Sequence, residues 1–287
     1  MVAVIKKELR SYFTSMTGYI FVASFLFFTG LFFTLNNMLG ASPDFNSVLA
    51  SILFIFLLAV PILTMRLMAE ETKQKTDQLL LTSPLTLTSI VLGKYLAAVI
   101  VFFGTLAFTF IYPLIMSTMG ELAWSEIIGG YIGFFLFGSA LIAVGLFIST
   151  VTENQVVAAV ATFTTLLILW LIDAIIQGLP TDKTAGIIFA LLLAAGIAAI
   201  TYFATRNIYV AAGIFGVGVI AIIVGYIVNP EIYTGFIARV LEWFSLYSRY
   251  EDFQLGILSL SPIVYYITFS SAFIFLSIRM LEKKRWS

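Results

Sequence analysis

The sequence contains no cysteine and no histidine among its 287 residues. The missing cysteines exclude disulfide bonds and thiolate metal sites, and the missing histidines exclude imidazole ligands, nucleophiles and proton relays. Charge is also scarce, because only 10% of the residues are charged and the 15 cations equal the 15 anions. This balance indicates neither a nucleic-acid partner nor an acidic substrate, so only the placement of the charges can be informative.

What the chain has in abundance is apolar surface, with 61% hydrophobic residues and 28 phenylalanines. Such a composition is typical of an integral membrane protein and predicts an all-α polytopic helical bundle. A membrane-spanning helix needs roughly 20 apolar residues, so uncharged runs mark the expected spans. We expect eight spans, at about residues 19–39, 48–68, 91–116, 128–149, 156–176, 186–204, 208–228 and 260–278.

The cations fall mainly on one side of these spans. If both termini are cytoplasmic, only Lys183, Arg239 and Arg249 of the 15 Lys and Arg residues lie outside. The positive-inside rule favours this topology. We therefore expect a multi-pass protein of a prokaryotic plasma membrane with both termini in the cytoplasm.

Two further segments have helical patterns but are too polar to span. In residues 1–17, apolar side chains recur at helical spacing while Lys6, Lys7 and Arg10 take the other side, which predicts an interfacial helix facing lipid phosphates or a partner. In residues 229–258, Asn229 can cap and Pro230 can open an external helix before the last span. Its expected apolar stripe runs to Tyr247.

The polar stretch EETKQKTDQLLLTSP, residues 70–84, separates two of the most apolar runs. We interpret it as a helix from Met68 or Ala69 to Leu81, ended by Thr82, Ser83 and Pro84, within a cytoplasmic hairpin at 69–90. The residues alone leave two possibilities open: a solvated loop whose leucines pack on the helix ends, or a contact for another protein.

The run AEETKQKTDQLLLTSPLTLTSIVLGKYLAAVI resembles the signature of type-2 ATP-binding-cassette (ABC) exporter permeases, with its acidic pair, Thr-Ser-Pro turn and Gly-Lys-Tyr entering a span. IKKELRSYFTSMTGYIF and SLYSRYEDFQLGILSLSPIVYYITFSSAFIFLSIRMLEKKRW are similar to the gliding-motility-like branch of that family. The resemblance implies one permease domain over residues 1–287 with a six-span exporter core. Residues 182–228 are then either an extra transmembrane hairpin inserted before the last core span, which we favour, or a segment in which one run is a re-entrant element.

The resemblance also implies partners: two ATPase subunits, a second permease copy or a homologue, and membrane lipids. No Walker sequence occurs in the chain, so we expect no enzyme activity and no cofactor here, with ATP and Mg bound by the partner ATPase. The polar stretch becomes a coupling helix that receives the motion of the ATPase. The residues expected at that contact are Glu70, Glu71, Thr76, Asp77, Leu79, Leu80, Ser83 and Pro84, with Glu153 and Asn154 at a second, smaller contact.

Glu153 also has a plain alternative role as a helix cap. Asp173, an acid inside an expected span, is a candidate for the transport pathway or for a structural role at the membrane boundary. The pair Gly129 and Gly133 more often reports helix packing than dimerisation. The phenylalanines of the first span are expected to face lipid or to pack.

Two other functions remain open from the residues. A secondary transporter needs ionisable groups near the bilayer midplane, for which Asp173 alone is a poor relay. A membrane-embedded enzyme would have to rely on Asp, Glu, Lys, Ser or Tyr. The sequence does not identify the transported substrate.

Overall fold

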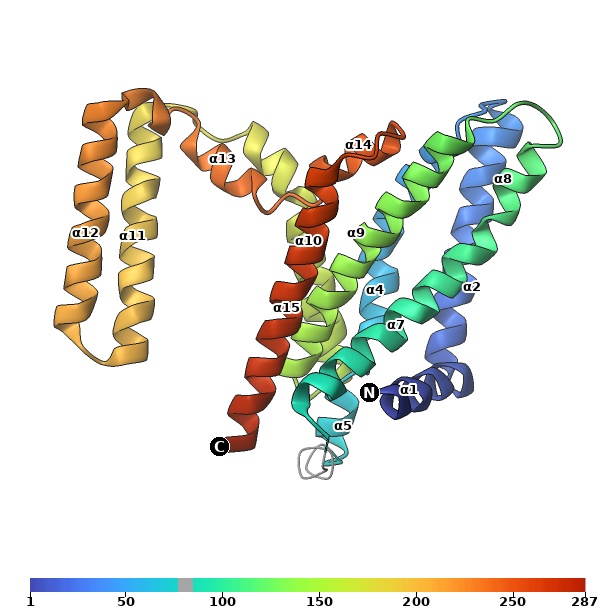
Figure 1. Ribbon diagram of the computed structural model, residues 1–287, viewed down its shortest axis with the longest axis horizontal. Coiled ribbons are helices and arrows are strands. Elements are labelled where there is room, and N and C mark those ends of the chain that lie inside the picture. The colour runs from blue at the N-terminus through green and yellow to red at the C-terminus, as the bar shows by residue number, and fades with distance from the viewer. Residues whose placement is uncertain (77–84, 287) are drawn as a thin grey trace. The chain divides into compact units, whose positions relative to one another are not determined.

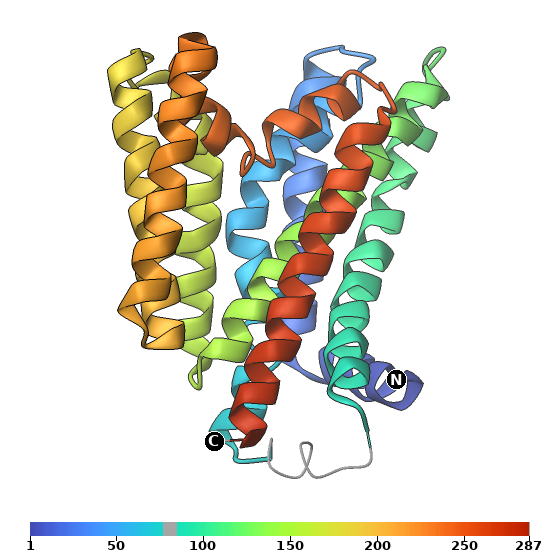
Figure 2. The ribbon, with the colours of Figure 1, turned by 60° about the vertical axis from the view of Figure 1, so that its left-hand side comes forward.

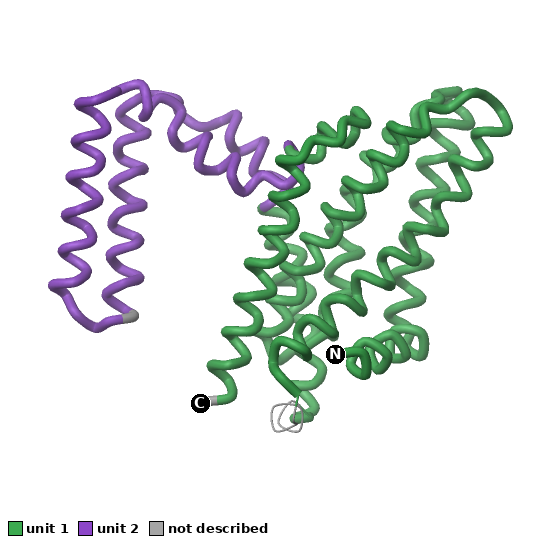
Figure 3. Tube along the Cα trace, viewed as in Figure 1, with its two compact units in different colours: residues 1–168, 249–287 green, residues 169–248 purple. Residues whose placement is uncertain are grey.

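The computed structural model describes residues 1–76 and 85–286, and the expected contact residues Asp77, Leu79, Leu80, Ser83 and Pro84 lie outside these ranges. The described residues are mostly helical and contain no strand (Figure 1). They separate into two compact units, with residues 1–168 and 249–287 in unit 1 and residues 169–248 in unit 2 (Figure 3). Each unit is described by itself below.

The prediction of eight spans is confirmed. Within the described ranges, eight helical stretches are long and apolar enough to cross a membrane: Met16–Leu39, Asn46–Lys73, Leu87–Met116, Trp124–Val151, Gln155–Gln177, Lys183–Phe203, Ile208–Val228 and Leu260–Arg285. The protein is therefore an all-α polytopic membrane protein, because helices satisfy most backbone hydrogen bonds within each run.

Several spans are interrupted rather than single regular helices. The first consists of α2 (Met16–Phe33) and the π-helix η1 (Thr34–Leu39), and the third of α7 (Leu87–Thr109) and α8 (Ile111–Met116). The second is the most divided. Its parts are α3 (Asn46–Ile52), the 3₁₀-helix η2 (Leu53–Ile55), α4 (Phe56–Thr64) and α5 (Ala69–Lys73).

The helix α9 (Trp124–Val151) lies at the centre of unit 1 and contacts α3, α4, α7, α14 (Glu251–Gln254) and α15 (Leu260–Trp286). Its glycines allow this close packing. A Cβ atom on Gly133 would meet the ring of Phe253, and one on Gly138 would meet the rings of Phe56 and Phe102. Gly129 and Gly133 thus pack within the chain, against the segment that contains α14.

Four buried phenylalanines from different spans form the core of unit 1. Phe25, Phe56, Phe102 and Phe134 come from α2, α4, α7 and α9, and their ring centroids lie 4.9–6.2 Å apart in mostly tilted and edge-to-face pairs. Such pairs add specific attraction to close packing. Phe25 therefore packs, whereas Phe27 of the same helix is 63% exposed.

Unit 1 has two distinguishable ends. Figures 1 and 2 both place α1 (Val2–Thr14), α5 and the end of α15 together, which we name the α5 end. The other end carries α8, α14 and the chain between η1 and α3, and we name it the α8 end.

The helix expected to continue to Leu81 ends early. The α5 helix stops at Lys73, and Lys75 has a left-handed backbone conformation (φ 56°). The N–H groups of Lys75 and Thr76 donate to the carbonyl oxygens of Thr72 and Glu71, which is the Schellman arrangement of a helix C-terminus. The prediction is thus wrong for residues 74–76, and Thr76 takes part in the cap.

In unit 2, the end of α10 (Gln155–Gln177) is followed by α11 (Lys183–Thr205) and α12 (Ile208–Val228), which pack as a hairpin (Figure 3). The continuous helix expected after Asn229 is wrong. Asn229 does cap and Pro230 does open a helix, but only the 3₁₀-helix η3 (Pro230–Tyr233) follows. Gly235, with φ 66°, separates it from α13 (Phe236–Glu242).

Candidate functional site

The break between α4 and α5 occupies residues 65–68 at the α5 end of unit 1. A break in a helix frees backbone N–H and C=O groups, and in an apolar protein each of them needs a partner. Here the partners are side chains from three neighbouring helices. We call this region, with the ends of α1, α2, α5, α7 and α9 around it, the junction.

Ser149 of α9 provides the first set of contacts to the break. Its Oγ accepts hydrogen bonds from the backbone N–H groups of Met68 and Ala69, at 3.0 and 3.1 Å. These are among the N–H groups that the start of α5 leaves without a partner in its own helix. Ser149 is fully buried and thereby caps α5 from the neighbouring span.

Lys94 of α7 and Tyr12 of α1 satisfy two carbonyl groups on the other side of the break. The Nζ of Lys94 donates to the carbonyl oxygen of Leu67 at 2.6 Å, and the hydroxyl of Tyr12 donates to that of Leu63 at 2.7 Å. Both side chains are buried. The break is therefore held in one conformation by α1, α7 and α9 together.

Lys94 also sits between two carboxylates. Its Nζ lies 2.9 Å from Glu8 Oε1 of α1 and 2.9 Å from Glu71 Oε2 of α5, and its side chain is only 2% exposed. A buried cation is tolerated when charge and hydrogen bonds compensate it, and here two acids and a carbonyl do so. This cluster joins α1, α5 and α7.

Glu71 is shared with Lys7, whose Nζ lies 2.8 Å from Glu71 Oε1. Partial burial lowers the pKa of Lys7, but the hydrogen bond and charge of Glu71, together with the charges of Glu8 and Glu70, raise it above its ordinary value. Lys7 therefore stays protonated and keeps this end of α1 on α5.

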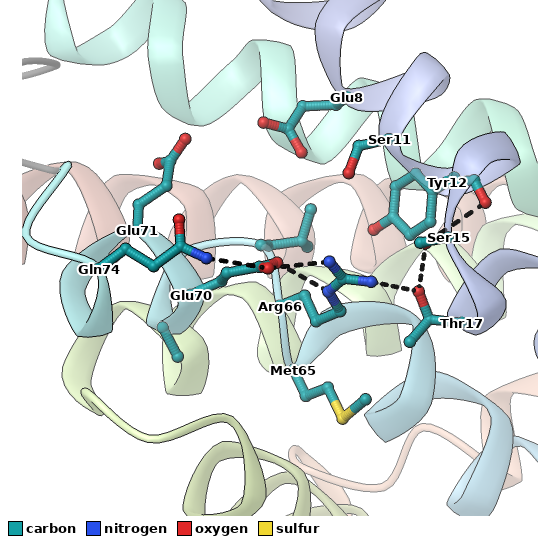
Figure 4. Close-up of polar contacts among 12 residues, drawn as sticks. Glu8, Ser11, Tyr12, Ser15, Thr17, Met65, Arg66, Glu70, Glu71 and Gln74 are labelled. Carbon is teal, nitrogen blue, oxygen red and sulfur yellow. Dashed lines mark hydrogen bonds and ion pairs between the residues drawn. The ribbon is translucent and has the colours of Figure 1, made fainter.

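The second acid of the pair, Glu70, holds α5 to the start of α2. Its carboxylate accepts two hydrogen bonds from Arg66, at 2.7 and 2.9 Å, and Arg66 also donates to Thr17 Oγ1 at 3.0 Å (Figure 4). A guanidinium that binds a carboxylate in this two-pronged way fixes orientation as well as distance. Three cations and three acids balance one another in the junction: Lys7, Arg66 and Lys94 with Glu8, Glu70 and Glu71.

The Gly-Lys-Tyr motif at the start of α7 has a contact for each of its residues. A Cβ on Gly93 would meet Val4, so this glycine allows α1 to lie against α7. Lys94 makes the contacts described above, and the Tyr95 hydroxyl donates to the Ser139 carbonyl of α9 at 3.1 Å. The motif thus joins α7 to both α1 and α9.

The structure assigns the predicted contact residues to different places. Glu70 and Glu71 lie in ion pairs within the chain, whereas Lys73 at the end of α5 and the following Gln74 and Lys75 are exposed, and we call these three residues the tip. Lys6 and Arg10 are exposed on α1. The contact of these residues with a partner or with lipid stays a prediction.

At the start of α10, the cap is Asn154, whose Oδ1 accepts from the N–H of Val156 at 2.9 Å, while Glu153 is exposed. In unit 2, Asp173 accepts a hydrogen bond from the buried Ser245 at 2.9 Å. This bond ties the end of α10 to the segment after α13. It gives Asp173 a structural contact at the boundary of its span.

Sequence reasoning missed the roles of Glu8, Tyr12, Lys94 and Ser149. The sequence did indicate a buried contact for Lys94, because a lysine at the start of an apolar run requires a partner. The indication for Glu8 was weaker: it lies one helical turn from Val4, on the face of α1 that is buried. Nothing in the sequence indicated the role of Ser149, because serine is common at helix ends.

We expect Ser149→Ala to lower the free energy of unfolding by about 1–3 kcal/mol, because it leaves two buried N–H groups without their acceptor. Denaturation in detergent micelles measures the change. The matched control is Ser271→Ala, since Ser271 is exposed and bonds only to the carbonyl of Ile267 in its own helix. Equal effects of the two substitutions would show that Ser149 does not hold the break.

These features define a class: a polytopic helical membrane protein whose second span is broken at one end and tied there to three other spans. A family model described as ABC-2 family transporter protein matches residues 39–181, which include the break, α7 and α9. With the eight apolar helices, this match supports an ABC transporter permease of the ABC-2 type. A search of curated proteins found no match.

Proposed function

We propose that the chain is the permease subunit of an ABC exporter, of the gliding-motility-like branch, in which separate ATPase subunits drive export across a prokaryotic plasma membrane. ATP and Mg²⁺ would bind to the ATPase subunits, two per complex. A second permease copy or a homologue would complete the pathway. The family match supports the permease class. The contacts of the junction support the transmission of motion from the ATPase to the spans.

The observation that carries the proposal is the set of contacts that attaches α5 to the rest of unit 1. Lys73 at the end of α5 and the following Gln74 and Lys75 are exposed, so a partner can reach this tip. The buried part of α5 is bound to α9 through Ser149, to α7 through Lys94 and to α2 through Arg66. A displacement of the tip by an ATPase would therefore move several spans together instead of bending a loop.

The last helix, α15, is also attached at the α5 end of unit 1. Lys284 of α15 donates to the carbonyl of Thr150, close to the end of α9, at 2.7 Å. A cation at the C-terminus of a helix is stabilised by the free carbonyls there. The last span is thus also attached at the α5 end, and we propose that this end is cytoplasmic.

Photo-crosslinking tests the proposed partner directly. A photoreactive phenylalanine in place of Gln74, in the exposed tip, is expected to crosslink to an ATPase subunit in the native membrane. The matched control replaces Asp44, which is exposed at the α8 end. A crosslink to an ATPase only from position 44, or from neither position in a membrane where the chain is active, would contradict the proposal and favour a transporter that works without an ATPase.

A further inference from the structure

The α8 end of unit 1 contains a cavity of about 340 Å³, which we name the loop cleft. Two connections form it: the end of η1 with the following residues 41–43, and the end of α8 with residues 119–122. The volume is in the range of pockets that hold small molecules. The junction and the coupling proposal make no use of this cavity.

The charge around the loop cleft has one sign. Glu121 lines the cleft, and Asp44 and Glu126 are the other charged residues of the two connections and the first turn of α9. The sequence has no Lys or Arg from residue 11 to 65 or from residue 95 to 182. Arg249, which precedes α14 at the same end, lies over the ring of Tyr265, and within the part of the chain that the structure describes no cation forms an ion pair with Glu121. The cleft therefore favours a cation.

A second observation points to a hydrogen-bond donor as the ligand. Asn37 lines the cleft and is 7% exposed. Its amide nitrogen donates to the carbonyl oxygens of Ser42 and Asp44, at 2.7 and 3.0 Å, which fixes the orientation of the amide. Its Oδ1 is buried and has no partner among the described residues. A buried acceptor of this kind gains from a donor brought by a ligand.

The remaining wall is apolar and polarizable. Met38, Met116 and Met119 line the cleft, and they are three of the eight methionines in the chain. Thioether side chains adapt their shape to an alkyl group. The cleft therefore combines one carboxylate and one free amide oxygen with a soft apolar surface.

We propose that the loop cleft binds a small organic cation, a primary alkylammonium. Its ammonium group donates to the carboxylate of Glu121 and to Asn37 Oδ1, and its alkyl chain lies against the three methionines. Because Oδ1 is buried, this second contact forms only when the Asn37 side chain shifts toward the ligand. This binding requires neither the ATPase nor transport.

Calorimetry on the purified protein in nonionic micelles tests the proposal, with n-butylammonium as the probe, neutral 1-butanol of the same size as its control, and protein-free micelles as the blank. We expect saturable binding of n-butylammonium and at least about tenfold weaker binding of 1-butanol, because the alcohol lacks the charge. Glu121→Gln is expected to weaken n-butylammonium binding by about tenfold. Glu121 is exposed, so this substitution leaves the fold intact.

The matched control is Glu126→Gln, since Glu126 does not line the cleft. It is expected to change the binding by less than about twofold, because its charge lies outside the cleft. Three results would overturn the proposal: equal binding of the amine and the alcohol, wild-type binding by Glu121→Gln, or no saturable binding below about 10 mM.

Discussion

Replacing Lys94 with methionine is expected to lower the free energy of unfolding by about 3–5 kcal/mol. Methionine matches the length of lysine but removes the charge. Glu8 and Glu71 then face each other without their shared cation, in side chains only 12% and 14% exposed. The carbonyl of Leu67 also loses its donor. Denaturation in mixed micelles measures the loss.

Two controls separate the buried cluster from lysine replacement in general. Lys183→Met removes the cation of an exposed ion pair, in which the side chains of Lys183 and Glu231 are 45% and 68% exposed. It should leave the free energy of unfolding nearly unchanged. The triple substitution of Lys94→Met with Glu8→Gln and Glu71→Gln should recover part of the loss, because it removes the unpaired charges. A Lys94→Met protein as stable as Lys183→Met would show that the cluster does not hold the junction.

The second large effect is expected from Gly133→Leu, at the centre of α9. A side chain at this position would occupy the space of the buried Phe253 ring, so α14 and α9 would have to separate. Overpacking of this kind costs about 1–3 kcal/mol or more, and we expect the upper part of that range because α9 has packed helices around it. Thermal unfolding of the purified protein would show the loss.

The control for this substitution lies on α7. Gly104 has nothing within 4 Å of the position where its Cβ would be, so Gly104→Leu should leave the stability nearly unchanged. Phe253→Ala opens the space that the introduced leucine side chain would need, and the double variant should lose less than the sum of the two single losses. Strict additivity would mean that Gly133 and Phe253 are not packing partners.

The spans could be predicted from the sequence because they depend on a local property. An uncharged run of sufficient length must satisfy its backbone as a helix, whatever surrounds it. Asn229 and Pro230 were likewise readable as a helix start, because capping depends on neighbouring residues. The early ends of α5 and η3 were not, since Lys75 and Gly235 take up left-handed conformations at these turns.

The site was predicted only in part. The stretch around Glu70 and Glu71 and the Gly93 to Tyr95 motif were identified, but the acids were expected to face a partner. Their pairing depends on three segments far apart in the chain, around residues 8, 70 and 94, which only the fold brings together. The spacing of charges in a sequence contains no information on such distances.

The most direct test of the rigid junction is a distance between α5 and α9 during the ATPase cycle. The chain has no cysteine, so Gln74→Cys and Val151→Cys can carry a pair of spin labels at exposed positions. In a complex with its ATPase, the junction predicts one narrow distance distribution that is the same without nucleotide and with ATP, and that broadens when Ser149→Ala is added. A shift of the distance or a second population on ATP binding in the otherwise unchanged chain would contradict the account.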